Sequence, residues 1–155
     1  MTQAKNTSVK IHFRFFSSIL DEWTVESIWA DTVDAEKGLY KLDNIPFYAP
    51  LASDDIIFAE YDETEQSLTY RKTIKHSGNS IVQVVLLDTT KDINTIRETF
   101  TKLACISEKL NDRYFVMEIR ADKEYKTIRQ KLTELENAGV ISYAEPCLSE
   151  NHWYD

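Results

Sequence analysis

The chain has 155 residues and a formal net charge of −8, with 43% hydrophobic and 12% aromatic residues, which suffices for the core of one domain or two small ones. Three glycines and three prolines are too few for a glycine-rich phosphate loop or a proline-rich linker. No run approaches the roughly 20 apolar residues that cross a bilayer. The polar residues 1–8 lack the pattern of an export signal, so we expect a cytoplasmic protein that does not bind membranes.

Residues 9–78 are predicted to form a β-rich half. In Val9–Phe16 the apolar side chains alternate with Lys10, His12 and Arg14, which is the pattern of a strand with one buried face. Similar short patterns, separated by polar turns, follow at 25–31, 38–42, 55–61 and 68–75. Five such strands predict a small bent β-sheet or a partly open barrel.

Residues 79–149 have a different order of elements. After the turn residues 76–79 (HSGN), strand patterns occur at 80–87, 106–109, 113–119 and 140–143, with helical patterns following Asp92 and Asp122. This βαββαβ order is typical of the ferredoxin-like fold. The sequence therefore predicts an α+β protein, in which the N-terminal β-rich half packs against a C-terminal ferredoxin-like half. Residues 1–8 and 150–155 are expected to be tails.

Acidic residues are concentrated in one segment of the chain. Residues 21–65 contain thirteen acids and two lysines, a net charge of −11, whereas the remainder carries +3. Direct nucleic-acid binding is disfavoured because it depends on lysine and arginine, and a basic protein partner suits this charge better. A charge that only keeps the protein soluble is the alternative. The acids expected to contact the partner are Asp54, Asp55, Glu60, Asp62, Glu63 and Glu65.

The segment NIPFYAP, residues 44–50, permits two interpretations. It could be a structural corner, in which Pro46 and Pro50 direct the chain while Phe47 and Tyr48 close the base of the β-rich half. It could also be an aromatic patch beside an acidic rim, which is the composition of a protein-binding hot spot. On the second interpretation Phe47 and Tyr48 belong to the partner-binding site.

No pattern in the sequence indicates catalysis, a metal ion or a cofactor. His12, His76 and His152 lack a second ligand at a spacing that would form a zinc site. His76 lies near Ser77 and Ser80, yet no nucleophile elbow is present. Cys105 and Cys147 fall on opposite edges of the predicted sheet, too far apart for a disulfide, so both are expected to be free thiols.

Several segments of the first 90 residues resemble a family of uncharacterised bacterial proteins classified only as a domain of unknown function. The similar segments are VKIHFRF (9–15), VESIWA (25–30), GLYKLDNIPFYAP (38–50), the acidic pair at 54–55 and SGNSIVQV (77–84). Family members often have glycine before the aspartate of the next strand, where this chain has Ser53. The resemblance implies a bacterial cytosolic protein and brings no established activity.

These observations favour a non-catalytic, acidic protein-binding module. The specific hypothesis is an immunity protein that neutralises a basic bacterial toxin such as a nuclease, by covering its positive groove with carboxylates. The alternative is a small-molecule-sensing or regulatory domain that uses the ferredoxin-like half. An enzyme would need ionisable groups that only folding brings together. The oligomeric state is not predicted.

Overall fold

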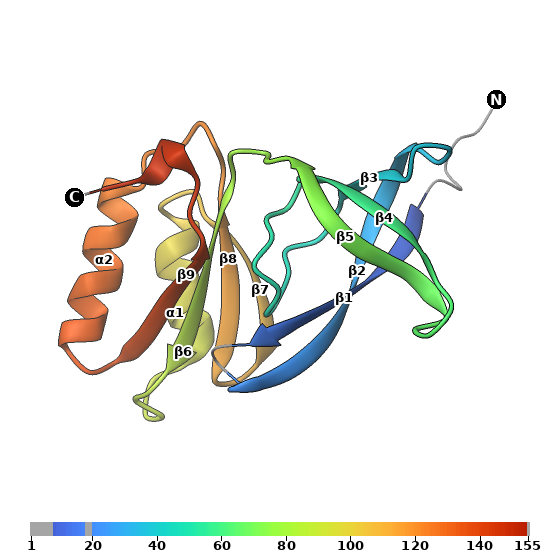
Figure 1. The fold of residues 1–155 in the computed structure, drawn as a ribbon. Helices are drawn as coiled ribbons and strands as arrows, with labels where there is room; N and C mark the ends of the chain where they lie inside the picture. The colour runs from blue at the N-terminus through green and yellow to red at the C-terminus, as the bar shows by residue number, and fades with distance from the viewer. Residues whose placement is uncertain (1–7, 18–19, 155) are drawn as a thin grey trace. The chain divides into compact units, whose positions relative to one another are not determined.

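The computed structural model describes residues 8–17 and 20–154. The chain divides into two compact units, of which the first ends at Ser77 and the second begins at Gly78. The predicted mixed α+β architecture is confirmed: a five-stranded ring-like sheet is followed by a second, antiparallel sheet with two helices (Figure 1).

The first unit is a ring of five strands that follow one another in sequence and pair with their neighbours. Each consecutive pair is antiparallel, and β1 closes the ring by a parallel contact with β5 at His12 and Thr69. The sequence predicted a bent sheet or a partly open barrel, and the β1–β5 contact closes it. The strands are β1 (Ser8–Ser17), β2 (Glu22–Asp34), β3 (Leu39–Leu42), β4 (Ile56–Asp62) and β5 (Ser67–Lys75).

The inside of the ring is filled by the alternate apolar residues that the sequence predicted. Ile11, Phe13 and Phe15 of β1 are buried, whereas Lys10 and Arg14 are exposed. The tight turn between β2 and β3 needs a glycine: Gly38 has a φ of +72°, and a Cβ there would lie 2.7 Å from the Ala59 carbonyl oxygen.

The second unit is a four-stranded antiparallel sheet with the strand order β7-β8-β6-β9. Strand β6 is therefore central although it is the first strand of the unit. In chain order the elements are β6 (Ser80–Leu86), α1 (Ile93–Thr101), β7 (Ile106–Asn111), β8 (Tyr114–Ile119), α2 (Lys126–Asn137) and β9 (Ile141–Cys147), followed by a short 3-10 helix at Glu150–His152.

The two helices begin differently. Asp92 caps α1 as predicted, because its carboxylate accepts a hydrogen bond from the Asn94 N–H at 2.8 Å. The predicted cap of α2 at Asp122 is wrong. Helix α2 begins later, after Tyr125, and no side chain caps its first turn. The chain leaves α2 through Gly139, whose φ of +76° permits the turn into β9.

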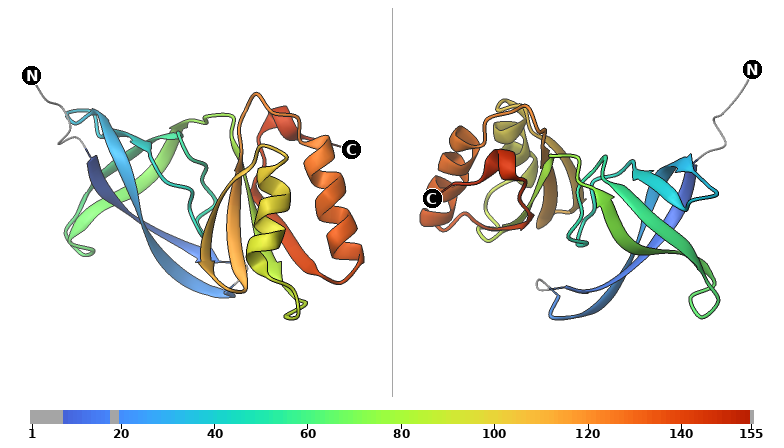
Figure 2. Two further views of the ribbon diagram at one scale, coloured as in Figure 1. Left: turned by 180° about the vertical axis from the view of Figure 1, so that it is seen from behind. Right: turned by 45° about the horizontal axis from the view of Figure 1, so that its top comes forward.

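Both helices cover the same face of the second sheet (Figure 2). Phe100 of α1 and Leu132 of α2 are fully buried against Val82, Val84 and Phe115 of the sheet. Among the residues that the structure describes, no helix combines the length and hydrophobicity needed to cross a membrane.

Both cysteines are free thiols, as predicted, and they should differ in reactivity. Burial raises the pKa of the Cys105 thiol to about 12, so hardly any reactive thiolate exists at about pH 8. We expect iodoacetamide to modify the half-buried Cys147 and to spare Cys105 until the protein unfolds. Peptide mass spectrometry before and after urea denaturation would measure this, and equal labelling of both thiols in the native protein would contradict the fold.

Candidate functional site

The acids predicted to contact a partner have different environments, and Asp55 is in the interior. Its side chain is 1% exposed. One carboxylate oxygen accepts a hydrogen bond from the Ala52 N–H at 3.1 Å and the other from the Ser77 N–H at 2.8 Å. Asp55 thus orders the chain before β4 and the chain after β5, and it is not available to a partner.

Three of the other predicted acids are paired within the first unit. Arg71 binds Glu60 at 3.0 Å and Asp62 at 2.8 Å, and His12 lies 3.0 Å from Glu65. The Arg71 side chain lowers the pKa of Asp62, helped by backbone N–H groups of the following turn. Part of the negative charge is therefore compensated locally.

The remaining acids are divided between the two ends of the ring. The exposed Asp21, Glu22 and Asp43 and the half-buried Asp54 belong to the β1–β2 and β3–β4 connections, and a second group belongs to the other two turns. The β2–β3 turn (35–38) and the β4–β5 turn (63–66) lie on the side of the ring opposite to the β3–β4 connection, at two separate corners (Figure 1). Glu36 and Glu63, one from each turn, are exposed. Asp34 and Asp62 flank them, and Lys37 is the cation in these turns. We call this region, residues 34–37 and 62–65, the acidic end.

Phe47 and Tyr48 lie in the connection between β3 and β4, residues 43–55, which is held by Glu26 of β2. The Glu26 carboxylate accepts hydrogen bonds from the N–H groups of Phe47 at 2.6 Å, Tyr48 at 3.0 Å and Ala49 at 2.8 Å. Desolvation, and secondarily the Glu26 charge, raises the pKa of Tyr48. Both aromatic side chains are half-buried. This geometry favours the interpretation of NIPFYAP as a structural corner.

The segment VESIWA, which contains Glu26 and Trp29, and the segment that contains NIPFYAP both carry the family resemblance. Two further hydrogen bonds connect these segments. Asn44 accepts a hydrogen bond from the Trp29 N–H at 3.0 Å, and the Asp43 N–H donates to the Trp29 carbonyl at 2.9 Å. The loop then places Ala49 and Leu51 in the core of the ring. The shared segments therefore build one structural feature, although they are distant in the sequence.

The outer surface of β1 and β2 carries a group of exposed aromatic residues that the sequence pattern did not predict as a site. Trp23 is 64% exposed, Phe16 51% and Trp29 47%. Strand pairing places Phe16 opposite Trp23 and Lys10 opposite Trp29. We call Lys10, Arg14, Phe16, Trp23 and Trp29 the aromatic face. The alternation of Trp23, Val25 and Trp29 was visible in the sequence, but their outward direction depends on the pairing of β2 with β1.

Cations lie over the rings of the aromatic face. The Arg14 guanidinium is 5.5 Å from the Trp23 ring centre, and Lys10 Nζ is 5.3 Å from that of Trp29. Phe16 meets Trp23 edge to face at 6.0 Å. These contacts hold large apolar side chains in place while leaving about half of their surface in water.

Comparisons with known proteins identify a family and a fold. The model of a family described as a domain of unknown function (DUF4265) matches residues 26–143. No curated protein matches the chain. The chain is similar to a solved structure described as a hypothetical protein from Neisseria gonorrhoeae, with a TM-score of 0.79, 22% sequence identity, and coverage of 92% of this chain and 96% of that chain. This likeness shows a shared fold.

The described residues contain no group of three histidine, cysteine, aspartate or glutamate side chains arranged to hold a metal ion. His12 is paired with Glu65, and the exposed His76 lies 3.9 Å from Asp55. The third histidine, His152, is buried in the second unit.

We expect Glu26→Gln to lower the free energy of unfolding by about 2–4 kcal/mol. Glutamine keeps the length of the side chain but has one acceptor oxygen, and its amide NH₂ would face a backbone N–H that now donates to the carboxylate. Urea denaturation followed by tryptophan fluorescence would measure the change. Glu22→Gln, exposed on the same strand, is the matched control and should change stability by less than about 0.5 kcal/mol. Equal stability of the two variants would contradict the anchoring role of Glu26.

Proposed function

This chain belongs to the DUF4265 family of unknown function, and we propose that it is a non-catalytic protein-binding module. The observation that carries the proposal is the aromatic face, where Phe16, Trp23 and Trp29 expose about half or more of their surface on one side of the ring. Tryptophan and arginine are the residue types that dominate binding energy at protein interfaces. The face combines two tryptophans with Arg14 and a phenylalanine.

The side chains of the aromatic face are already restricted in their motion, which favours a role in binding. Burying an exposed aromatic side chain in an interface stabilises the complex, but the side chain also loses conformational freedom. Here the strand pairing and the stacked Lys10 and Arg14 already restrict Trp29 and Trp23. The loss of freedom on binding is therefore smaller, and more of the burial energy remains as affinity.

The acidic end supports a basic partner. The pairing of His12 with Glu65 at 3.0 Å connects the β4–β5 turn to the middle of β1, so that turn lies close to the strand that carries Lys10 and Arg14. Exposed carboxylates such as Glu36 and Glu63 attract cationic surfaces over distances of about 10 Å. In this proposal the acidic end increases the rate of encounter, and the aromatic face holds the partner.

The specific role that we propose is that of an immunity protein for a basic bacterial toxin such as a nuclease. The toxin would contribute a positive surface, and the bound module would prevent access to its active site. Such a role would place the protein in the cytoplasm, where a toxin of this kind acts. The proposal includes no catalytic step, cofactor or metal ion.

We further infer that the second unit is ferredoxin-like. Its elements follow in the order βαββαβ, and its first strand lies between its third and fourth in the antiparallel sheet. The second candidate function is therefore a regulatory or small-molecule-sensing role of this unit. The observation that favours it is a pocket beside the start of α2.

Affinity purification from the native bacterium, followed by quantitative mass spectrometry, would test the aromatic face. We expect the full chain to enrich a basic protein, and the double variant Trp23→Ala/Trp29→Ala to recover at least about tenfold less of it, because two anchors are lost. Affinity for the purified partner should fall correspondingly.

Tyr61→Ala is the matched control, since Tyr61 is 62% exposed on β4 of the same unit and is not part of the aromatic face. It should leave recovery unchanged. Failure to enrich any protein over a control bait, or equal recovery with the double variant, would overturn the proposal.

Stopped-flow association at low and high salt would test the acidic end. We expect Glu36→Lys/Glu63→Lys to slow association with the purified partner by about tenfold at low salt, because two favourable charges become unfavourable. Glu108→Lys/Glu136→Lys, at two exposed acids of the second unit, changes the net charge by the same amount and is the control. If both variants slow association equally, the acidic end has no specific role.

A further inference from the structure

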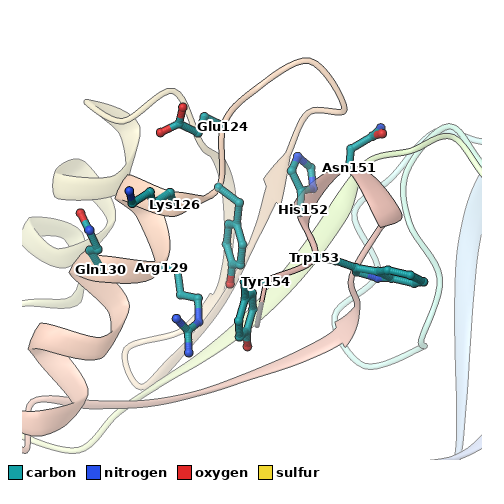
Figure 3. Close-up of a pocket in the computed structure, with 9 residues that line it drawn as sticks. Glu124, Lys126, Arg129, Gln130, Asn151, His152, Trp153 and Tyr154 are labelled. Atoms are coloured by element: carbon teal, nitrogen blue, oxygen red, sulfur yellow. The ribbon is translucent and has the colours of Figure 1, made fainter.

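The second unit contains a pocket of about 430 Å³ between the start of α2 and the C-terminal segment 151–154 (Figure 3). One wall consists of Lys126, Arg129 and Gln130 from α2, and the other includes His152 and Tyr154. Pockets that bind small molecules have volumes of roughly 300–1,000 Å³. The volume is therefore sufficient for a metabolite, and larger than a bare inorganic ion requires.

His152 fastens the C-terminal wall of the pocket. It is 2% exposed, and its Nδ1 lies 2.6 Å from the Ser80 hydroxyl. The Ser80 oxygen also accepts the Ser149 N–H at 2.8 Å, so the hydroxyl proton is directed to Nδ1. The His152 Nε2–H then donates to the carbonyls of Arg120 and Lys123, at 3.1 and 3.0 Å. A segment held by this many polar contacts forms a defined wall.

Glu145 of β9 fixes two tyrosines of the pocket. Its carboxylate accepts hydrogen bonds from the hydroxyls of Tyr125 and Tyr154, each at 2.5 Å. Burial, and then the bond to Glu145, raises the pKa of Tyr125. The bond to Glu145 likewise raises the pKa of Tyr154. The two phenols therefore stay protonated. Each donates its hydroxyl proton to one oxygen of the Glu145 carboxylate, so both carboxylate oxygens have a hydrogen-bond donor.

The cations of the pocket have no carboxylate at ion-pair distance among the described residues, although Tyr154, and more weakly the Glu145 charge behind it, raise the pKa of Arg129. Arg129 stacks on Tyr154 with its guanidinium carbon 3.6 Å from the ring centre (Figure 3). Its buried Nε has no hydrogen-bond partner, which is a costly state for a charged donor. Glu124 is the acid among the lining residues that the structure describes.

The backbone adds to the positive potential. Helix α2 has twelve residues, no side-chain cap and no acid in its first turn, so no side chain bonds its first N–H groups. Glu124, directly before the N-cap Tyr125, offsets part of this positive potential. Helix α1, capped by Asp92, shows the contrasting arrangement within the same unit.

We propose that this pocket binds a small metabolite through an anionic group, either a phosphate monoester or a carboxylate. The anion lies against Lys126, Arg129 and the first turn of α2, and the remainder of the molecule contacts Tyr154 and Trp153. This site is independent of the aromatic face and of the proposed protein partner.

Amide NMR titration of the full chain would test the proposal with 5′-AMP as the phosphate ester and benzoate as the carboxylate. At least one should shift the amides of residues 126–130 to saturation, with a Kd of about 1 mM or below. Adenosine and benzamide are the matched uncharged ligands and should not bind there. Sodium chloride at equal ionic strength should cause no saturable shift.

Arg129→Gln should weaken binding at least about tenfold, and Lys126→Gln, which changes an exposed side chain that the fold does not use, should weaken it several-fold. Lys131→Gln on the same helix, whose lysine is already paired with Glu134, should leave affinity within about twofold. Absence of saturable shifts with both anions, equal binding of the uncharged ligands, or unchanged affinity in both Arg129→Gln and Lys126→Gln would overturn the proposal.

Discussion

The bonds from the Glu26 carboxylate to three successive backbone N–H groups determine the path of the longest irregular connection in the first unit. A loop such as 43–55 leaves many backbone donors without strand partners, and donors removed from water must find acceptors. Glu26 supplies them at one side of the loop, and Asp55 supplies them near its end. With its path fixed, the loop delivers Ala49 and Leu51 to the interior of the ring.

Because some carboxylates bind backbone groups, the net charge of a segment does not measure the negative charge that a partner would meet. The segment 21–65 is strongly acidic, yet its acids have three different roles. Glu26 and Asp55 order backbone, Glu60 and Asp62 share Arg71, and others such as Glu36 remain exposed. Only the exposed carboxylates contribute to a field that a partner would meet, because a paired or hydrogen-bonded acid is compensated nearby.

The two proposed sites share one feature, a cation that lies over an aromatic ring. On the aromatic face, Arg14 and Lys10 lie over tryptophan rings, and in the pocket Arg129 lies over Tyr154. A cation stacked on a ring keeps its charge while losing part of its motion. In both places the ordering occurs before any ligand arrives, so less entropy is lost on binding. The sites lie in different units and need not act together.

The sequence by itself determined the α+β class, the order of the strands and helices, the inward face of β1 and the Asp92 cap, because these depend on local periodicity and on neighbouring residues. It also indicated the family through short segments. Only the tertiary structure decided which acids remain exposed, that Trp23 and Trp29 point outward together, and that Arg129 meets Tyr154. These outcomes depend on strand register and on contacts between residues far apart in the chain, and a shift of one residue in register would turn each of those tryptophans to the opposite face.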